Sequence, residues 1–230
     1  MPSRGKKYEK IAERVPSKVL SLKEAVESTK KLSYSKFDGT VELHVALNLP
    51  KDKDPKSIKG SVSLPHMEAK AAVIAVAVPD HLQAAVKEAG ADIYVLEDLL
   101  KELKDGKVNF DILLSVPEVM SQLASMGKVL GPKGLMPNPK NGTVADGSKI
   151  VDTIGEFKRG KLVFKADAAG GIHIPVGKVS FEGKKLQENI KEAVHYIAVM
   201  MGRNKEAVIK NAYLTPTMGP AVQFDIKLMD

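Results

Sequence analysis

The sequence predicts a two-domain α/β protein in which an acidic domain is inserted into a basic one. Its 230 residues suit one to two domains of ordinary size. The formal net charge of +7 is unevenly distributed, because residues 1–67 carry +6, residues 68–156 carry −4 and residues 157–230 carry +5. The outer segments also contain alternating polar and apolar strands, whereas the middle segment alternates apolar strands with helices. We therefore expect one domain from residues 1–67 and 157–230, and a second from residues 68–156.

The first segment predicts one helix followed by two strands. Ser21 and Glu24 have the spacing of a capping box, which opens the helix. The first strand alternates, with Glu42 and His44 on the face opposite its valines and leucines. This alternation is typical of a half-buried strand in an antiparallel or mixed sheet. The helix and the two strands are expected at residues 21–32, 40–48 and 61–64.

The middle segment predicts strands and helices in alternation. Its first strand is a continuous run of small apolar residues, as expected for a strand covered on both faces. Asp80 is a candidate N-cap for the helix that follows, and Gly90 is its C-terminal stop. The alternation is the pattern of a three-layer α/β domain with a parallel sheet. The strands are expected at residues 72–78, 91–95 and 110–116, and the helices at residues 80–90, 97–104 and 117–125.

The last segment predicts two strands, a long amphipathic helix and two further strands. The turn-rich residues 167–171 separate the first two strands and suggest a hairpin. The last two strands are joined by Thr-Pro-Thr-Met-Gly-Pro at residues 215–220. The strands are expected at residues 162–166, 172–176, 208–214 and 221–228, and the helix at residues 184–201.

Several classes of protein lack support in this sequence. It has no cysteine, which removes disulfides, cysteine–zinc sites and iron–sulfur clusters. The dinucleotide-binding and P-loop glycine motifs are missing, and none of the five histidines lies in an H-E-x-x-H pattern. No apolar run reaches the roughly 18 residues of a membrane span, and the basic N-terminus lacks the apolar core of a secretory signal. We expect no enzyme, cofactor, metal or membrane association, and a cytoplasmic location.

Residues 130–144 are the most unusual local feature. They read Leu-Gly-Pro-Lys-Gly-Leu-Met-Pro-Asn-Pro-Lys-Asn-Gly-Thr-Val, with three prolines, three glycines and two lysines. The prolines and glycines favour an ordered structural loop with an unusual path. The lysines equally favour a cationic ridge that faces RNA or the other domain. The residues alone leave both interpretations open.

Two further segments carry chemistry suited to RNA. In residues 215–220, a methionine beside a glycine allows close approach by a partner, and a threonine hydroxyl can bond a ribose. The alternative is a plain turn with the methionine tucked inward. In residues 36–40, a lysine can neutralise a phosphate and a phenylalanine can stack on a base. The alternative, which is the more common case, is a core phenylalanine at the entry to a strand.

Five segments together resemble a known family, the bacterial ribosomal protein L-one family of the large-subunit stalk. They occur in the order found in the family and extend from end to end of the chain. The long Pro/Gly/Lys segment is highly specific. The matching segments are residues 36–44, 60–66, 130–144, 171–178 and 217–220.

The resemblance implies a fold and a set of partners. The fold is a discontinuous α+β domain of split β-α-β type, made of both chain ends, with an inserted three-layer α/β, Rossmann-like domain. The implied function is binding to the large-subunit rRNA stalk, beside other large-subunit components, and release of tRNA from the exit site. The family also represses translation by binding the mRNA of its own ribosomal-protein operon. Off the ribosome the protein is expected to be a monomer.

Carried over by position, the resemblance implies a site for rRNA and mRNA. Asn211 stands where the family usually has serine, and its longer amide puts that individual contact in question. Pro216 is also less usual and should stiffen the last turn. In the middle domain, Lys133 and Lys140 are candidates for a tRNA or interdomain contact. The implied site residues are Lys36, Phe37, Thr40, His173, Asn211, Thr217, Met218 and Gly219.

Two other functions are consistent with the residues. The middle α/β domain permits an enzyme that binds a nucleotide or another small molecule, because such folds host many activities. The positive net charge permits a nonspecific nucleic-acid-binding protein. Saturable thermal stabilisation by nucleotides would favour the first function. Steep salt dependence without preference for the stalk rRNA would favour the second.

Overall fold

A computed structural model of the chain describes residues 5–50, 54–67, 73–105 and 108–229. It forms two compact units. Unit 1 comprises Met1–Glu68 and Phe164–Asp230, and unit 2 comprises Ala69–Val163. The expected division after residue 156 falls inside a helix, whereas the division in the structure comes a few residues later. No helix in the described ranges is both long and apolar enough to cross a bilayer.

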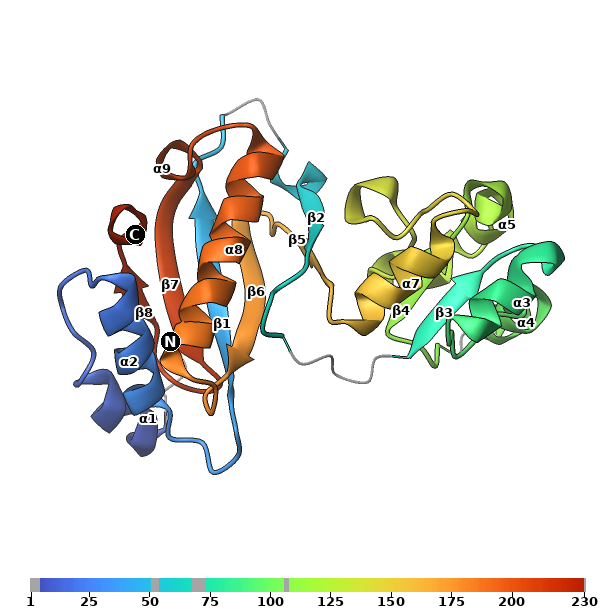
Figure 1. Ribbon diagram of the computed structural model, residues 1–230. Coiled ribbons are helices and arrows are strands. Elements are labelled where there is room, and N and C mark those ends of the chain that lie inside the picture. The colour runs from blue at the N-terminus through green and yellow to red at the C-terminus, as the bar shows by residue number, and fades with distance from the viewer. Residues whose placement is uncertain (1–4, 51–53, 68–72, 106–107, 230) are drawn as a thin grey trace. The chain divides into compact units, whose positions relative to one another are not determined.

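A four-stranded sheet in the order β6–β1–β7–β8 forms the centre of unit 1 (Figure 1). β1 is antiparallel to both of its neighbours, and β7 is antiparallel to β8. β6 and β7 therefore run parallel to each other on either side of β1. The helix α8 connects them, which gives an arrangement of split β-α-β type. The strands are β1 Thr40–Leu47, β6 Gly171–Lys178, β7 Ile209–Pro216 and β8 Val222–Phe224.

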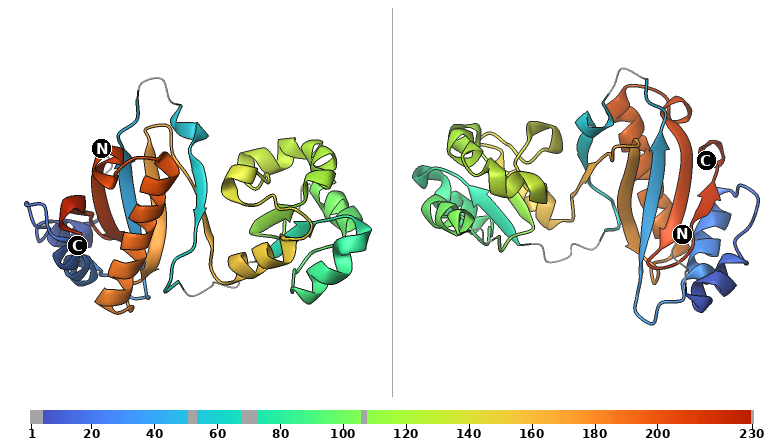
Figure 2. Two further views of the ribbon diagram at one scale, coloured as in Figure 1. Left: turned by 45° about the horizontal axis from the view of Figure 1, so that its top comes forward. Right: turned by 180° about the vertical axis from the view of Figure 1, so that it is seen from behind.

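Two helices cover one face of this sheet and leave the other face open. α2 packs against β7 and β8, and α8 packs against β6. Seen from behind in the right-hand view of Figure 2, no described helix lies over β6, β1 and β7. The capping box forms as expected at the start of α2, where Ser21 and Glu24 exchange hydrogen bonds. The helices of unit 1 are α1 Lys6–Ala12, α2 Leu22–Leu32, α8 Gly183–Met201 and α9 Lys205–Val208, with short 3₁₀ turns η1 Pro55–Ser57 and η4 Ile226–Leu228.

The alternating pattern of β1 determines which side chains meet solvent. Every second residue from Val41 to Leu47 is buried under the helices, as the sequence predicts. The intervening residues lie on the open face and are only partly buried. Burial of the valines and leucines therefore fixes the register, since a slip of one residue would exchange the two faces. The open-face residues of β1 are Thr40, Glu42, His44 and Ala46.

A second sheet pairs β2 (Lys59–Val62) with β5 (Leu162–Lys165). The expected hairpin between residues 162–166 and 172–176 is wrong, because β5 pairs with β2 and β6 pairs with β1. Between the two strands, the Asp167 Oδ1 accepts the backbone N–H groups of Ala169 and Gly171 and closes a tight turn. After this turn the chain continues as β6, which belongs to the four-stranded sheet.

Unit 2 has a small parallel sheet with helices packed on it. β3 (Ile74–Ala77) and β4 (Ile112–Ser115) pair in parallel, and all four residues of β3 are buried. Single parallel bridges add Ile93 beside β3 and Val144 beside β4. The helices of unit 2 are α3 Asp80–Glu88, α4 Leu96–Lys104, α5 Met120–Ala124, α6 Gly127–Lys133 and α7 Ile150–Lys158, with 3₁₀ turns η2 Pro117–Val119 and η3 Pro139–Asn141.

Two predictions for unit 2 are wrong in detail, and a third is confirmed except for the type of its first turn. Residues 91–95 are not a strand, because only Ile93 forms a bridge before α4 begins. Asp80 is the first residue of α3 and not its cap. Pro79 takes the N-cap position, without a side-chain hydrogen bond. The helix expected at residues 117–125 begins as a 3₁₀ turn, in which proline takes the first position.

Residues 130–144 are not simply a loop. α6 extends to Lys133, its Leu130 is fully buried, and Gly134 ends it with φ 72°. Two glycines and a proline within α6 lower its helix propensity, which hides it from sequence patterns. α7 is also absent from the sequence prediction, although its Ile150, Ile154 and Phe157 are buried in unit 2.

A bulge in β6 is held by the buried Asn189 of α8. The register of β1 and β6 shifts so that Val176 has no partner on β1. The Asn189 Nδ2 donates to the carbonyl oxygen of Val176 at 2.7 Å. The Asn189 Oδ1 accepts the backbone N–H of His66 at 2.9 Å. One side chain thereby satisfies two backbone groups and fixes β6 to α8.

Asn189→Leu should destabilise unit 1 without changing side-chain volume greatly. It leaves the carbonyl of Val176 and the N–H of His66 unpaired, at a cost of about 2–4 kcal/mol in the free energy of unfolding. Urea unfolding followed by circular dichroism measures this change. The matched control is Lys184→Ala, on the exposed side of the same helix. Equal stability of the two variants would contradict the role given to Asn189.

Candidate nucleic-acid interface

The turn after β7 projects Met218 into solvent. The Gly219 N–H donates to the carbonyl oxygen of Pro216 at 2.8 Å and closes the turn. Met218 has φ 67°, and it is the only non-glycine residue with positive φ in the described part of the chain. Such a conformation costs about 1–2 kcal/mol. The Met218 side chain is 63% exposed, so the alternative with an inward methionine is wrong.

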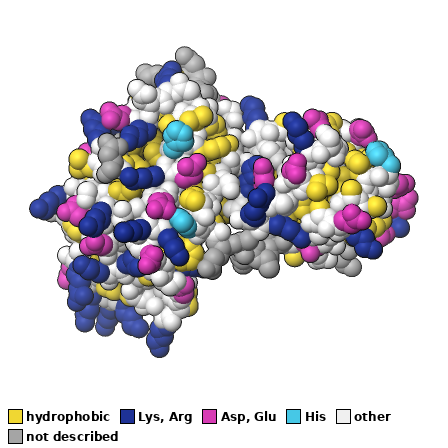
Figure 3. All heavy atoms as spheres, viewed as in Figure 1, with side chains coloured by type: hydrophobic (Ala, Val, Ile, Leu, Met, Phe, Trp, Pro, Cys, Tyr) yellow, Lys and Arg dark blue, Asp and Glu magenta, His cyan; other side chains and the backbone are white. Residues whose placement is uncertain are grey.

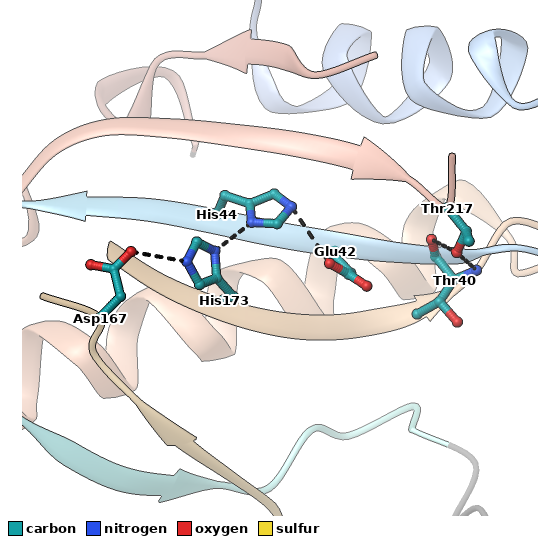
Figure 4. Close-up of polar contacts among 6 residues, drawn as sticks. All are labelled: Thr40, Glu42, His44, Asp167, His173 and Thr217. Carbon is teal, nitrogen blue, oxygen red and sulfur yellow. Dashed lines mark hydrogen bonds and ion pairs between the residues drawn. The ribbon is translucent and has the colours of Figure 1, made fainter. Parts of the chain in front are cut away.

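Three hydrogen bonds join Thr217 to Thr40 at the start of β1. The Thr217 N–H donates to the Thr40 carbonyl oxygen at 2.9 Å. The Thr217 Oγ1 accepts the Thr40 N–H at 2.8 Å and donates to the Thr40 carbonyl oxygen at 3.1 Å. The hydroxyl takes the place of the backbone carbonyl that an antiparallel ladder would offer to Thr40. The turn is therefore attached to β1 although the strand pairing ends there (Figure 4).

The other side of the turn rests against the segment that follows α2. The Tyr34 hydroxyl donates to the carbonyl oxygen of Met218 at 2.8 Å. A β-carbon on Gly219 would lie 2.5 Å from Pro216 Cγ and 3.3 Å from the Leu32 carbonyl oxygen. Only glycine fits at this position. The turn is thus held on two sides, and its backbone comes close to the end of α2.

Residues 33–39 form a rigid loop with Phe37 on its outer side. The Ser35 hydroxyl donates to the Phe37 carbonyl oxygen at 2.9 Å. The Asp38 carboxylate accepts the hydroxyl of Ser180 at 2.7 Å and its backbone N–H at 3.0 Å. These hydrogen bonds, chiefly that of the hydroxyl, lower the pKa of Asp38, so the carboxylate is ionised at neutral pH. The Phe37 side chain is 57% exposed, which excludes the alternative of a core phenylalanine.

The structure brings six of the expected site residues together at one end of the sheet of unit 1. We call this group the turn surface. The exposed Lys36 lies beside Phe37, in the loop that leads into β1. Thr40 additionally accepts a hydrogen bond at its Oγ1 from the Lys178 ammonium at 3.1 Å. The turn surface consists of Lys36, Phe37, Thr40, Thr217, Met218 and Gly219.

The other expected residues lie elsewhere. His173 is in the middle of β6, opposite His44. Asn211 is near the far end of β7, where its Oδ1 accepts a hydrogen bond from Gln223 Nε2 at 3.5 Å. At a rise of about 3.3 Å per residue, it lies roughly 20 Å from Thr217. The two candidates of unit 2, Lys133 at the end of α6 and Lys140 in η3, are both exposed.

Sequence patterns missed the residues that position this surface. Tyr34 and Met218 are 184 residues apart, and Asp38 and Ser180 are 142 apart, so no local pattern relates them. Sequence alternation placed Glu42 and His44 on the open face, but it gave no partner for either. Figure 4 shows that His44 contacts His173 and that carboxylates lie at both ends of this pair. Among the described residues, no group of three or more His, Cys, Asp and Glu could hold a metal ion.

Basic side chains gather on the helical parts of unit 1. In Figure 3, Lys and Arg side chains crowd over the region of α1 and α2, with acidic side chains between them. α1 contributes Lys6, Lys7 and Lys10, and α2 ends with Lys30 and Lys31. These charges favour association with a polyanion independently of its sequence.

Thr217→Val should loosen the turn surface while preserving the shape of the side chain. It removes the acceptor of the Thr40 N–H, so unfolding free energy should fall by about 1–2 kcal/mol. Hydrogen exchange at the Thr40 amide should become at least about tenfold faster, which corresponds to ~1.4 kcal/mol. Thr215→Val, on the same strand, is the control. Unchanged protection of the Thr40 amide in Thr217→Val would contradict the assigned hydrogen bond.

A family model and several known proteins match this chain over most or all of its length. The model of the ribosomal protein L1p/L10e family matches residues 29–220. "Large ribosomal subunit protein uL1" of Fervidobacterium nodosum is 40% identical over 232 residues, covering 100% of this chain and 98% of that protein. The protein of the same name from Thermus thermophilus is 38% identical over 229 residues, covering 98% of this chain and 99% of that protein. That of Thermosipho melanesiensis is 38% identical over 226 residues, covering 97% of each.

The matched family accounts for the absence of an enzyme motif, since its members are ribosomal proteins and not enzymes. The matched range begins within α2 and ends just after the turn that carries Met218. It therefore includes the whole turn surface and all of unit 2. This chain belongs to the ribosomal protein L1p/L10e family.

Proposed function

We propose that this chain is a component of the large ribosomal subunit in the bacterial cytoplasm and binds the rRNA of the mobile stalk through its turn surface. The observation that carries the proposal is the exposure of two large apolar side chains, Phe37 and Met218, on loops fixed by hydrogen bonds. A phenylalanine can stack on an unpaired base, and a thioether can pack on a sugar. RNA contact would explain why such side chains are held in solvent.

The turn surface also suits RNA because it is already formed in the free protein. Thr217 and Tyr34 hold the turn on either side, so little conformational entropy is lost on binding. Gly219 allows a ribose or base to approach the backbone closely. Lys36 and the lysines of α1 and α2 add attraction to phosphates that does not depend on sequence. Specificity then comes from the shape of the turn surface and affinity partly from the lysines.

Met218→Asp should weaken binding to a stalk rRNA fragment by at least about 30-fold, or ~2 kcal/mol, because it places a charge in an apolar contact. The measurement is filter binding at fixed salt, with an unrelated folded RNA as competitor. The control is Val199→Asp on α8. Val199 is also 63% exposed, and this substitution adds the same negative charge. Wild-type affinity of Met218→Asp would refute the site. Equal competition by the unrelated RNA would instead favour a nonspecific nucleic-acid-binding protein.

The same surface is proposed to bind the mRNA of the protein's own ribosomal-protein operon and so to repress its translation. A preformed surface recognises any RNA that presents the same shape, which allows one site to serve both RNAs. The mRNA fragment should then compete with the rRNA fragment for one site. Met218→Asp should lower both affinities by the same factor. Simultaneous binding of both fragments would contradict this proposal.

Release of tRNA from the exit site is proposed to involve unit 2. Lys133 and Lys140 are exposed, and Lys133 ends α6, beside Gly134. Replacing both lysines by alanine should slow tRNA release from reconstituted ribosomes while leaving affinity for the stalk rRNA unchanged, because neither lysine belongs to the turn surface. Release at the wild-type rate would contradict a role of Lys133 and Lys140 in tRNA release.

A further inference from the structure

A surface cavity of about 490 Å³ lies beside the C-terminal half of α8, on the helical side of unit 1. One wall is a stripe of α8 within residues 191–202, whose members recur every three or four residues and therefore share one face of the helix. The other wall consists of residues 203–205, at the connection from α8 to α9, and of Met229 after η4. All of these residues belong to unit 1, and none belongs to the turn surface.

The cavity is far from the turn surface. β6 ends beside the start of β1, because Lys178 pairs with Thr40 in the sheet register. α8 begins shortly after Lys178 and has 19 residues, which gives it a length of about 28 Å. It returns along the sheet to the end at which β7 begins, where Ile209 pairs with Leu47. A ligand in the cavity therefore leaves the turn surface free for RNA.

The floor of the cavity is aliphatic. Val194, Ala198 and Met229 line it and are buried, whereas Val199 lines it with a side chain that is 63% exposed. Figure 3 shows hydrophobic side chains over the C-terminal half of α8, with Lys and Arg side chains next to them. None of the described lining residues is Phe, Tyr or Trp. The cavity thus offers contact to an aliphatic side chain but no ring on which a nucleic-acid base could stack.

Basic side chains surround this floor. Lys191, Arg203 and Lys205 line the cavity, and the described lining residues include no acid, since Glu192 and Glu206 lie outside it. Within the described ranges, neither the Lys191 ammonium nor the Arg203 guanidinium has a salt-bridge partner. The C-terminal end of a helix disfavours anions, but Arg203 and Lys205 lie just beyond this end of α8 and offset that effect. The cavity is therefore suited to a ligand with negative charge.

A side-chain amide adds hydrogen-bonding capacity to the wall. Asn204 takes the N-cap position of α9, but its side chain makes no capping hydrogen bond. This side chain is exposed at the cavity. An amide both donates and accepts, which matches the N–H and C=O groups of a peptide backbone. An aliphatic floor, cations and an amide in one cavity together match an acidic peptide segment that contains an aliphatic side chain.

We propose that this cavity is a docking site for an acidic peptide segment of another protein. An aliphatic side chain of that segment covers Val199 and the floor, and its flanking carboxylates pair with Lys191 and Arg203. Charge complementarity decides the occupant, because the segment supplies the anions that these two cations lack, whereas RNA would leave the aliphatic floor without a matching group. The inference does not depend on the proposed function, since the docking site and the turn surface lie at opposite ends of unit 1.

The probe is a short synthetic peptide with a Leu-Leu pair between runs of glutamate. Fluorescence anisotropy with the full-length protein, at a salt concentration of about 0.1 M that screens distant charges, should show saturable binding. Replacing both leucines by serine should weaken binding by at least about tenfold, the usual effect of losing one buried leucine contact. Absence of saturable binding up to about 1 mM peptide, or equal binding of the two peptides, would overturn the inference.

Two variants separate the charge from the aliphatic contact. Arg203→Glu should weaken binding of the leucine peptide by at least about tenfold, because attraction becomes repulsion. Val199→Ser should weaken it by about fivefold but leave binding of the serine peptide unchanged. The matched controls are Lys184→Glu, the same charge reversal at the other end of α8, and Val19→Ser, an exposed valine outside the cavity. If each control has the effect of its matched variant, the peptide does not bind in the cavity.

RNA competition tests the other class of polyanion. The stalk rRNA fragment should leave peptide affinity unchanged, because its proposed site is at the opposite end of unit 1. If this fragment or an unrelated single-stranded RNA displaces the peptide, and Arg203→Glu weakens binding of the displacing RNA as much as that of the peptide, the cavity binds nucleic acid and the inference is overturned. Failure of the stalk rRNA fragment to bind at all would instead refute the proposed function and leave the peptide result standing, so the two failures are distinguishable.

Discussion

Thr217 and Thr40 share three hydrogen bonds, and the candidate interface depends on them. A ladder between β1 and β7 would end at Pro216, because the chain turns away and proline has no N–H to contribute. The Thr217 hydroxyl extends the pairing by one more residue, since it both accepts from and donates to the backbone of Thr40. The turn that follows is thereby attached to a strand whose position is fixed by its buried residues.

This attachment offsets the strain of the exposed methionine. Positive φ at Met218 costs about 1–2 kcal/mol, and each hydrogen bond of Thr217 contributes about 0.5–1.5 kcal/mol. The Tyr34 hydroxyl adds a further bond to the Met218 carbonyl oxygen. Strain that surrounding bonds maintain is characteristic of positions where a side chain must be presented in one place. The geometry thus links local backbone energetics to the presentation of one exposed side chain.

Sequence patterns predicted the parts of the structure that depend on local periodicity. The alternation of β1 gave its buried and open faces, and the capping box at Ser21 gave the start of α2. Sequence patterns failed where contacts between segments distant in sequence determine the structure. β5 and β6 are adjacent in sequence but pair with different partners, and α6 forms with its Leu130 buried although it contains glycines and a proline. Two of the five family-like segments contain the residues of the turn surface, whereas its anchor Tyr34 and the contact of His44 with His173 depend on sheet register and loop packing.

We propose that the strained turn exists to present the Met218 side chain to RNA. Met218→Gly tests it most directly, because glycine adopts positive φ without strain and removes only the side chain. Stability and stalk rRNA affinity should be measured on the same full-length protein. We expect equal or higher stability together with at least about tenfold weaker binding, a loss of ~1.4 kcal/mol. Wild-type affinity in this variant would contradict it.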